Sequence, residues 1–238
     1  GVPEKLYVKH LQPLADKAAP VGTLFEPNLE ALAGLGPGLI VGGGRSAAQK
    51  AAVEQVAPAI DMTIGEDLLV DAKARITAFG TLFERQDKAA ELTASLDAKI
   101  AEATAAGKDK GRALIVMTNG PKLAAYGKAS RFGWIHQATG LPEAVETIKD
   151  TNHGDAISHE FIAQANPDWL IVIDRGAAIG EEGQSAADVL KNPLVEGTNA
   201  WKSGHVVYLD AADAYISAGG YTSTTTLLDE LTAALTKG

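Results

Sequence analysis

Two arginines stand shortly after apolar runs at matched places in the chain. Arg45 follows Leu39–Val41, and Arg175 follows Trp169–Ile173. A guanidinium group stays charged and offers several N–H donors in a planar fork, so this pair suits an anionic ligand that carries hydrogen-bonding oxygens. An ion pair about 4 Å apart is worth roughly 4 kcal/mol at an effective dielectric of about 20, so a few such contacts can dominate affinity after desolvation.

The segments around the two arginines match each other at an offset of 130 residues. Residues 30–45 and residues 160–175 both place a glutamate seven residues before a proline and an arginine eight residues after it. Each segment is typical of a short helix, a proline turn and a buried strand. Ligands of open parallel sheets bind beyond the carboxyl ends of strands, so two facing units would aim both arginines into one cleft. A chance match is the competing interpretation, and the shared glutamate and arginine favour a real repeat.

The wider pattern predicts an α/β protein with a parallel sheet, because strand-like and helix-like segments alternate. Short apolar runs predict strands at 39–41, 58–64, 113–117, 169–173 and 206–209. Helical spacing predicts helices at 46–56, 66–83, 87–106, 131–140 and 222–236. No long glycine- or proline-rich linker is present, so a helix at 87–106 is expected to join an N-terminal lobe, 1–85, to a C-terminal lobe, 110–238.

Composition excludes several classes of protein. The 238 residues carry a formal net charge of −9, whereas a nucleic-acid binder would need a basic face. There is no cysteine, which rules out disulfides and thiolate metal sites. No apolar run reaches the length of a membrane span. An anionic small ligand remains compatible with this composition, because a local cluster of arginines can override the net charge.

Several motifs, taken in order, resemble a known family. Residues 166–175, Asn-Pro-Asp-Trp-Leu-Ile-Val-Ile-Asp-Arg, resemble the second-lobe signature of class III periplasmic binding proteins. Residues 130–133 (Ser-Arg-Phe-Gly), 152–154 (Asn-His-Gly) and 208–210 (Tyr-Leu-Asp) with Tyr215 resemble the subgroup that binds ferric catecholate siderophores such as enterobactin fragments and petrobactin. Each motif alone is weak, whereas their order and spacing across the chain are more specific.

The resemblance implies two Rossmann-like lobes joined by a long backbone helix, with a ferric catecholate siderophore captured in the cleft between them. It implies a carrier that delivers this ligand to the permease of an ABC importer, and not an enzyme. Iron(III) would arrive within the siderophore complex, with no intrinsic cofactor. The protein would be a monomer, periplasmic or lipid-anchored at the cell surface. Family members begin with a further strand and helix, so the N-terminal lobe is expected to lack them, and the opening Gly1-Val2-Pro3 predicts a processed or trimmed chain.

The resemblance also assigns site residues. Arg45, Arg131 and Arg175 are expected to bind the anionic ligand. The repeat also supports Arg45 and Arg175, whereas the assignment of Arg131 depends on the resemblance alone. His153 and Tyr215 resemble the pair that completes the iron coordination when a siderophore offers only four donors. Fe³⁺ prefers anionic oxygen, so a tyrosinate suits it, and imidazole is an acceptable second ligand. The competing interpretation is a solvated loop histidine and a packed tyrosine.

Glu30 and Glu160 occupy the same place in the two repeat units, each on a predicted helix. In the family, one such glutamate per lobe meets arginines on the transporter. The resemblance therefore implies a docking role for both, with Glu26 as an alternative to Glu30. Two exposed helix glutamates without a role are the competing interpretation, and their pairing across the repeat favours docking.

A glycine-rich loop, Gly42–Gly44, supports a different function. Together with the residues up to Ala47 it fits Gly-x-Gly-x-x-Ala, a dinucleotide-binding pattern, and Asp61 lies at a tolerable distance for a ribose contact. The alternative is therefore a nucleotide-binding oxidoreductase. It ranks lower because the third glycine is missing and the bulky Arg45 stands where pyrophosphate would approach. A third class is an interaction module that has lost its ligand.

Overall fold

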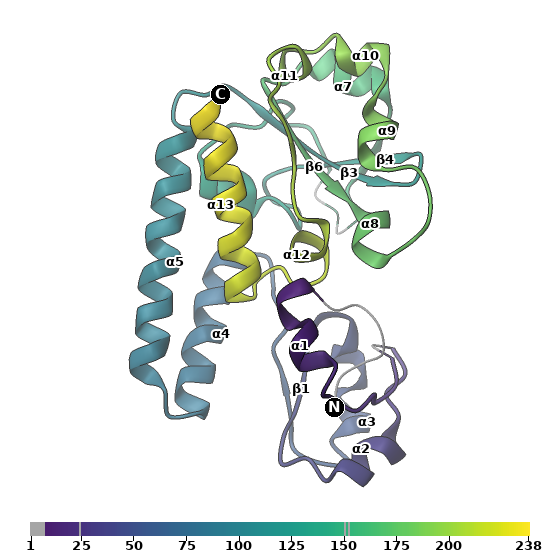
Figure 1. Ribbon diagram of the computed structural model, residues 1–238, viewed down its shortest axis with the longest axis vertical. Coiled ribbons are helices and arrows are strands. Elements are labelled where there is room, and N and C mark those ends of the chain that lie inside the picture. Colours follow the sequence, from purple (N-terminus) through teal and green to yellow (C-terminus); the bar gives the residue numbers. More distant parts are fainter. Residues whose placement is uncertain (1–7, 24, 150, 152) are drawn as a thin grey trace. The chain divides into compact units, whose positions relative to one another are not determined.

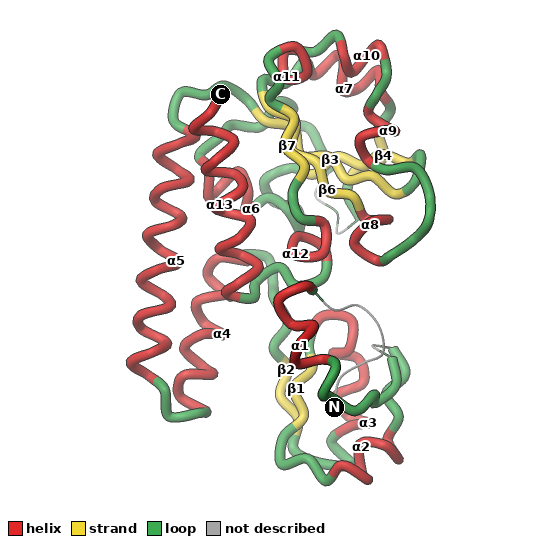
Figure 2. Tube along the Cα trace, in the orientation of Figure 1, coloured by secondary structure: helices red, strands yellow, loops and turns green. Residues whose placement is uncertain are grey.

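The computed structural model describes residues 8–23, 25–149, 151 and 153–238 (Figure 1, Figure 2). Contacts divide the chain into two compact units, residues 1–65 and residues 66–238. Both units combine helices with a β-sheet, so the predicted α/β class is confirmed.

The first unit has a small parallel sheet in which β1 (Ile40–Gly42) pairs with β2 (Ala59–Asp61). Its helices are η1 (Lys9–Leu11), α1 (Gln12–Ala15), α2 (Leu29–Leu35), η2 (Gly44–Gln49) and α3 (Lys50–Val53). A buried cluster in this unit contains Val21, Leu32 and Val53. The helix predicted at 46–56 is instead a 3-10 helix followed by one α-helical turn. At its start, the Ser46 hydroxyl accepts from the Gly43 N–H and donates to the Gly43 carbonyl oxygen, which fixes the turn after β1.

The second unit is built on a larger sheet, which has the strand order β5-β4-β3-β6-β7 among the described residues. The strands are β3 (Ala113–Asn119), β4 (Lys122–Tyr126), β5 (Asp155–Ile157), β6 (Trp169–Asp174) and β7 (Val206–Tyr208). The helices are α4 (Leu68–Leu82), α5 (Gln86–Gly107), α6 (Trp134–Thr139), α7 (His159–Ala165), α8 (Arg175–Ile179), α9 (Ala186–Leu190), α10 (Pro193–Glu196), α11 (Asn199–Lys202), α12 (Ala211–Tyr215) and α13 (Tyr221–Lys237).

The predicted parallel sheet is only partly parallel in this unit. β3, β6 and β7 are parallel, but β4 runs antiparallel to both β3 and β5. Neither β4 nor β5 was predicted from the sequence. β4 contains two alanines, which have a weak intrinsic preference for strands, and it forms because it pairs with β3 through a tight turn at Gly120.

The central strands form the core of the second unit. β3 and β6 are nearly continuous runs of buried apolar residues, as expected for strands covered on both faces. Alternate residues of these strands pack with residues of α7 and α9. This buried cluster includes Leu114, Val116, Leu170, Val172, Ile162 and Val189. The sheet is therefore a rigid base for side chains at its edges.

The long helix predicted at 87–106 is present as α5. Its buried residues Ala89, Leu96 and Ala103 recur every seven positions, so they form one stripe. Gly107 continues this stripe, and a Cβ at that position would lie 2.0 Å from the Thr139 carbonyl oxygen, so the helix end approaches α6 closely. α5 packs on α4, α6 and α13, all within the second unit (Figure 2). Its role as a connector between two lobes stays a prediction.

The repeat seen in the sequence recurs in the local structure. α2 and α7 begin and end at positions 130 residues apart, and each is followed by a strand, β1 and β6. Asn28 and Ser158 cap the helix starts with their side-chain oxygens. Gly36 and Asn166 end them in the left-handed conformation, with φ values of 56° and 40°. Shared caps at both ends favour a real repeat over a chance match.

Candidate functional site

The parallel strands of the second unit bring several polar side chains to one edge of the sheet. Asn119 ends β3, Arg175 directly follows β6, and Tyr215 ends α12, the helix that follows β7. The carboxyl ends of parallel strands meet at the same edge, which is the usual place for ligands in open α/β sheets. The topology thus places these three residues together, although they are far apart in the sequence.

Arg175 is bracketed by two protein acceptors. Its Nε donates to the Tyr215 hydroxyl at 3.0 Å, and its Nη1 donates to Asn119 Oδ1 at 2.9 Å. The Arg175 side chain is 28% exposed, and its Nη1 also lies 3.6 Å from Glu181 Oε2. Within the described part of the chain, its Nη2 group donates to no protein acceptor. Two N–H donors of a half-buried guanidinium are therefore available to a ligand.

Arg131 contacts the same tyrosine from another direction. Its Nη2 donates to the main-chain oxygen of Tyr215 at 2.5 Å, and its Cζ lies 4.5 Å from the centroid of the Tyr215 ring. Arg175 Cζ lies 5.6 Å from the same centroid. A cation over an aromatic face is attracted by the ring quadrupole, which helps to hold two like charges near one ring. Three predicted site residues, Arg131, Arg175 and Tyr215, are thus in mutual contact through Tyr215, and we call them the arginine–tyrosine cluster.

The short helix that carries Tyr215 is fixed to the rest of the unit by polar contacts. Asp210 caps α12 by accepting from the main-chain N–H groups of Ala212 and Asp213, both at 3.1 Å. The buried Asp213 carboxylate accepts from the Ser223 hydroxyl at 2.7 Å, and Ser223 lies in the first turn of α13. A buried carboxylate that accepts such a bond near a helix N-terminus is well stabilised. Tyr215 is therefore presented by an anchored segment.

A second tyrosine, Tyr126, packs against Phe132, the ring over which Arg131 of the arginine–tyrosine cluster also lies. Its side chain is buried, its hydroxyl donates to Met117 Sδ at 3.7 Å, and its ring packs edge-on against Phe132. Burial raises the pKa of Tyr126 to about 12, although the positive charges of Arg131 and Arg175 partly offset this effect. The Tyr126 hydroxyl is thus buried and engaged with Met117, and it is not presented to a ligand. Sequence reasoning missed both Tyr126 and Asn119.

His153 lies exposed in a turn next to this region. The following residue, Gly154, has a φ of 72°, and a Cβ built on it would lie 2.8 Å from the Ala125 carbonyl oxygen and from the Tyr126 ring. The turn therefore packs directly on Tyr126. His153 makes no hydrogen bond with the described residues. Its predicted role as an iron ligand stays a prediction, and Asn152 of the same motif lies outside the described residues.

Replacing Gly154 by alanine is expected to destabilise the second unit more than the same change at Gly180. Both glycines have a left-handed φ, 72° and 68°, but a Cβ at Gly180 meets no atom within 4 Å. Conformational strain alone costs about 1 kcal/mol, and overpacking against Tyr126 adds about 1–3 kcal/mol at Gly154 only. Chemical denaturation gives the free energy of unfolding of each variant. Equal losses at the two positions would show that Gly154 serves the turn conformation alone.

Arg45 lies in the first unit, exposed in η2 just after β1. The loop before it is tied to the end of β2, because the Gly44 N–H donates to Thr63 Oγ1 at 2.8 Å and Thr63 Oγ1 donates to Asp61 Oδ1 at 2.5 Å. The carboxylate that a dinucleotide site would use for ribose is therefore engaged within the protein. A 3-10 helix, rather than a regular α-helix, follows the glycines. Both observations weaken the nucleotide-binding alternative.

Glu30 and Glu160 are both exposed, each as the second residue of its helix, α2 or α7. A hydrogen bond from the Ser158 hydroxyl to the Glu160 carboxylate lowers the pKa of Glu160. Glu26, the alternative to Glu30, is also exposed. Both repeat glutamates are thus accessible to a partner, and their docking role stays a prediction.

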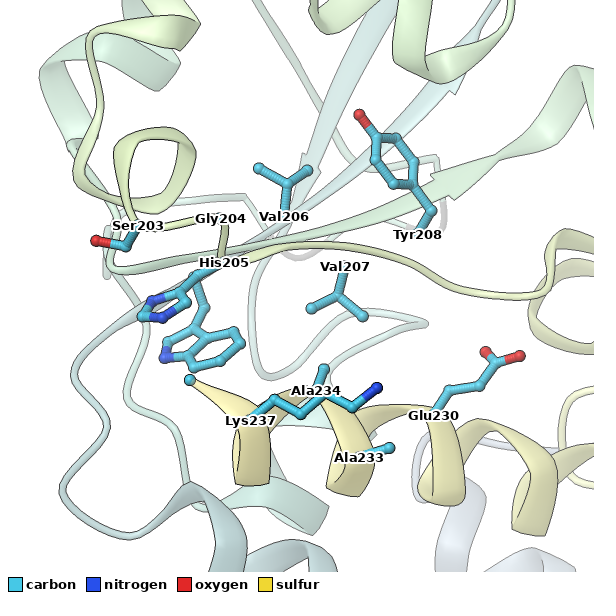
Figure 3. Close-up of a pocket in the computed structure, with 12 residues that line it drawn as sticks. Ser203, Gly204, His205, Val206, Val207, Tyr208, Glu230, Ala233, Ala234 and Lys237 are labelled. Atoms are coloured by element: carbon cyan, nitrogen blue, oxygen red, sulfur yellow. The ribbon is translucent and has the colours of Figure 1, made fainter.

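A hollow of about 490 Å³ lies elsewhere in the second unit, between β7 and α13 (Figure 3). Trp169 and His205 line it and stack on each other, with ring centroids 4.1 Å apart. Glu230 and Lys237 line it from α13 (Figure 3). None of the predicted site residues lines this hollow.

The described residues form neither a cluster of metal ligands nor a membrane-spanning helix. In residues 8–23, 25–149, 151 and 153–238, no three His, Asp or Glu side chains gather closely enough to hold a metal ion. No helix of the same residues is long and apolar enough to cross a bilayer.

Known proteins resemble this chain along its whole length. The family model described as periplasmic binding protein matches residues 2–212. The petrobactin-binding protein YclQ of Bacillus subtilis is 37% identical over 240 residues, which cover 100% of this chain and 75% of YclQ. The ferric-anguibactin-binding protein FatB of Vibrio anguillarum is 34% identical, over 89% of this chain and 67% of FatB.

Solved structures agree with these matches. The crystal structure of YclQ superposes with a TM-score of 0.94 at 36% identity, over 100% of this chain and 84% of that one. The periplasmic catecholate-siderophore binding protein VctP of Vibrio cholerae superposes with a TM-score of 0.86 at 29% identity, over 92% of this chain and 79% of that one. The chain therefore belongs to the periplasmic binding protein family, as its motifs indicated, and it is a binding protein rather than an enzyme.

Proposed function

We propose that this protein captures a ferric catecholate siderophore and delivers it to the permease of an ABC importer. The observation that carries the proposal is the arginine–tyrosine cluster, in which two guanidinium groups converge on Tyr215 at the carboxyl edge of the sheet. Ferric catecholates are anionic, and their charge is spread over oxygens that accept hydrogen bonds. The similarity to YclQ, FatB and VctP points to the same class of ligand.

The chemistry of the cluster fits such a ligand. The Nη2 group of Arg175 has two N–H donors without a partner among the described residues, and Arg131 is exposed beside it. Tyr215 supplies the anionic oxygen that Fe³⁺ prefers, and His153 supplies an imidazole from the adjacent turn. A hexadentate siderophore would use the arginines alone, whereas a tetradentate one would add the tyrosine and the histidine as iron ligands.

The proposal includes a two-lobed architecture with α5 as the backbone helix. The repeat supports it, because each unit contains one helix–strand–arginine element with the same helix caps. Arg45 is then the first unit's donor to the anionic ligand, the counterpart of Arg175. The protein would work as a monomer outside the cytoplasmic membrane, in the periplasm or lipid-anchored at the cell surface.

Native mass spectrometry with a panel of iron chelates tests the proposed function. We expect a 1:1 complex with ferric enterobactin, a hexadentate tris-catecholate, and with the ferric complex of a tetradentate bis-catecholate. NAD serves as the probe for the nucleotide-binding alternative and should give no complex. A complex with NAD and none with either catecholate would reverse the ranking of the two functions. No complex with any probe would favour an interaction module.

Charge reversal at both repeat glutamates is expected to abolish uptake without changing affinity for the ligand. Glu30→Arg with Glu160→Arg would place positive charges against the transporter arginines that the family resemblance implies, and like charges repel. Uptake of radiolabelled ferric siderophore by cells measures transport, and titration of the purified protein measures affinity. Glu102→Arg with Glu146→Arg is the matched control, since these two exposed glutamates lie outside the repeat. Normal uptake by the Glu30/Glu160 variant would exclude the docking role.

A further inference from the structure

Asn119 holds the guanidinium of Arg175 from a different direction than Tyr215 does. Asn119 Oδ1 accepts from Nη1 at 2.9 Å, whereas the Tyr215 hydroxyl accepts from Nε at 3.0 Å. These nitrogens are different corners of a planar group. Two bonds in different directions fix the plane of the guanidinium as well as its position, so they determine where the remaining Nη2 donors point.

Asn119 is a rigid support for this contact. It is the last residue of β3, which pairs with β4 on one side and β6 on the other, and its own main chain is in register with Lys122 of β4. Its side chain lies at the partly exposed end of an otherwise buried strand. The amide is therefore held at a fixed place beside the arginine–tyrosine cluster.

The chemistry of an amide suits this place better than a carboxylate would. Glu181 also approaches Nη1, but its Oε2 lies 3.6 Å away and its side chain is 56% exposed, so water screens this ion pair. A carboxylate in place of Asn119 would hold the guanidinium and also neutralise the charge that an anionic ligand needs. A neutral amide oxygen orients Arg175 and leaves its positive charge available.

We infer that Asn119 is a positioning residue for ligand capture, an inference that rests on the proposed function above. It sets Arg175 so that both Nη2 N–H groups point toward an oxygen of the ferric siderophore, and it acts through Arg175 without touching the ligand itself. This preorganisation lowers the side-chain entropy that would otherwise be lost when the ligand binds.

A double-mutant cycle on the full chain, with ferric enterobactin as the probe, tests this inference. Asn119→Leu keeps the size of the side chain and removes the acceptor, and we expect affinity to fall about tenfold. In the Arg175→Ala background, Asn119→Leu should lower affinity for ferric enterobactin by less than about twofold, because the residue through which Asn119 acts is gone. Unchanged affinity of the single variant, or an equal loss in both backgrounds, would overturn the inference.

A second readout needs no ligand. In the ligand-free protein, the side-chain N–H resonances of Arg175 should be distinct, because its two hydrogen bonds hinder rotation of the guanidinium. Asn119→Asp keeps an oxygen acceptor at the same place, so the distinct resonances should persist. In Asn119→Leu the guanidinium can rotate more freely, so its N–H resonances should merge into an averaged signal. The same Asn119→Asp variant should bind ferric enterobactin more weakly than the wild type, because the carboxylate neutralises Arg175. Distinct resonances in Asn119→Leu would contradict the positioning role.

The two levels of the proposal fail in different ways. Wild-type protein that binds no ferric catecholate would reject the proposed function and the positioning role together. Wild-type protein that binds, alongside an Asn119→Leu variant that folds and binds equally well, would reject the positioning role alone. Thermal unfolding of each variant shows whether it is folded.

Discussion

Replacing Arg175 by alanine is expected to weaken the binding of ferric enterobactin by about 100-fold, since each lost hydrogen bond to a charged group is worth about 1.5–3 kcal/mol. Arg175 supplies two Nη2 N–H donors from a half-buried position, where water screens the charge less than at the surface. The change also leaves the Tyr215 hydroxyl and the Asn119 amide without their common partner. Titration monitored by tryptophan fluorescence measures the loss.

The other arginines provide a graded comparison. Arg131→Ala should lower affinity for ferric enterobactin about tenfold, less than Arg175→Ala does. The Arg131 side chain is more exposed than that of Arg175 and already donates to the Tyr215 main chain. Arg45→Ala should also weaken binding if the first unit contributes to the site. Arg85→Ala is the matched control, since Arg85 is an exposed arginine at the start of α5. The affinity of this variant for ferric enterobactin should stay within about twofold of the wild type. Unchanged affinity in all three site variants would remove the arginines from the binding site.

Removing the proposed iron ligands should separate tetradentate from hexadentate siderophores. In the double variant His153→Ala with Tyr215→Phe, affinity for a tetradentate bis-catecholate complex should fall by at least about 100-fold. Mutating even a residue that only hydrogen-bonds to a metal ligand typically lowers metal affinity 10–100-fold, and these two residues would bind the iron directly. A hexadentate siderophore fills every iron position and needs neither residue as a ligand. The visible charge-transfer band expected from a tyrosinate–iron bond should disappear with the double variant.

The structure refines this expectation for the hexadentate ligand. The Tyr215 hydroxyl also accepts the Arg175 Nε–H, so Tyr215→Phe should weaken hexadentate binding by up to about tenfold through the arginine. His153 contacts none of the described residues by hydrogen bond, so His153→Ala alone should leave hexadentate binding unchanged. Equal losses for both siderophore types in His153→Ala would mean that His153 lines the site without binding iron.

The sequence predicted the long, periodic elements well and the short ones poorly. α5 begins and ends within one residue of its prediction, because a seven-residue apolar stripe marks its whole length. β4 was missed because its alanines carry little strand preference and its pairing with β3 is a tertiary effect. The parallel sheet was predicted from the alternation of elements, and only the hairpin at Gly120 makes it mixed.

The candidate site shows the same limits. Arg175 was found from the repeat, and Arg131, His153 and Tyr215 from family motifs, because in each case the local sequence holds the signal. Asn119 precedes Gly120-Pro121 and has the pattern of an ordinary turn residue. Its contact with Arg175 joins residues 56 positions apart, so only the folded sheet reveals it. Tyr126 escaped notice for the same reason, since its burial depends on packing against Phe132 and Gly154.

A crystal structure of the full chain with ferric enterobactin would locate the ligand and so show whether Arg175 binds it. We expect anionic oxygens of the siderophore at about 2.7–3.2 Å from the Nη2 group of Arg175, with the Asn119–Arg175 hydrogen bond retained. We also expect Arg131 to face the same ligand. A siderophore bound instead in the hollow beside Trp169 and His205, or at any place out of reach of Arg175, would contradict it.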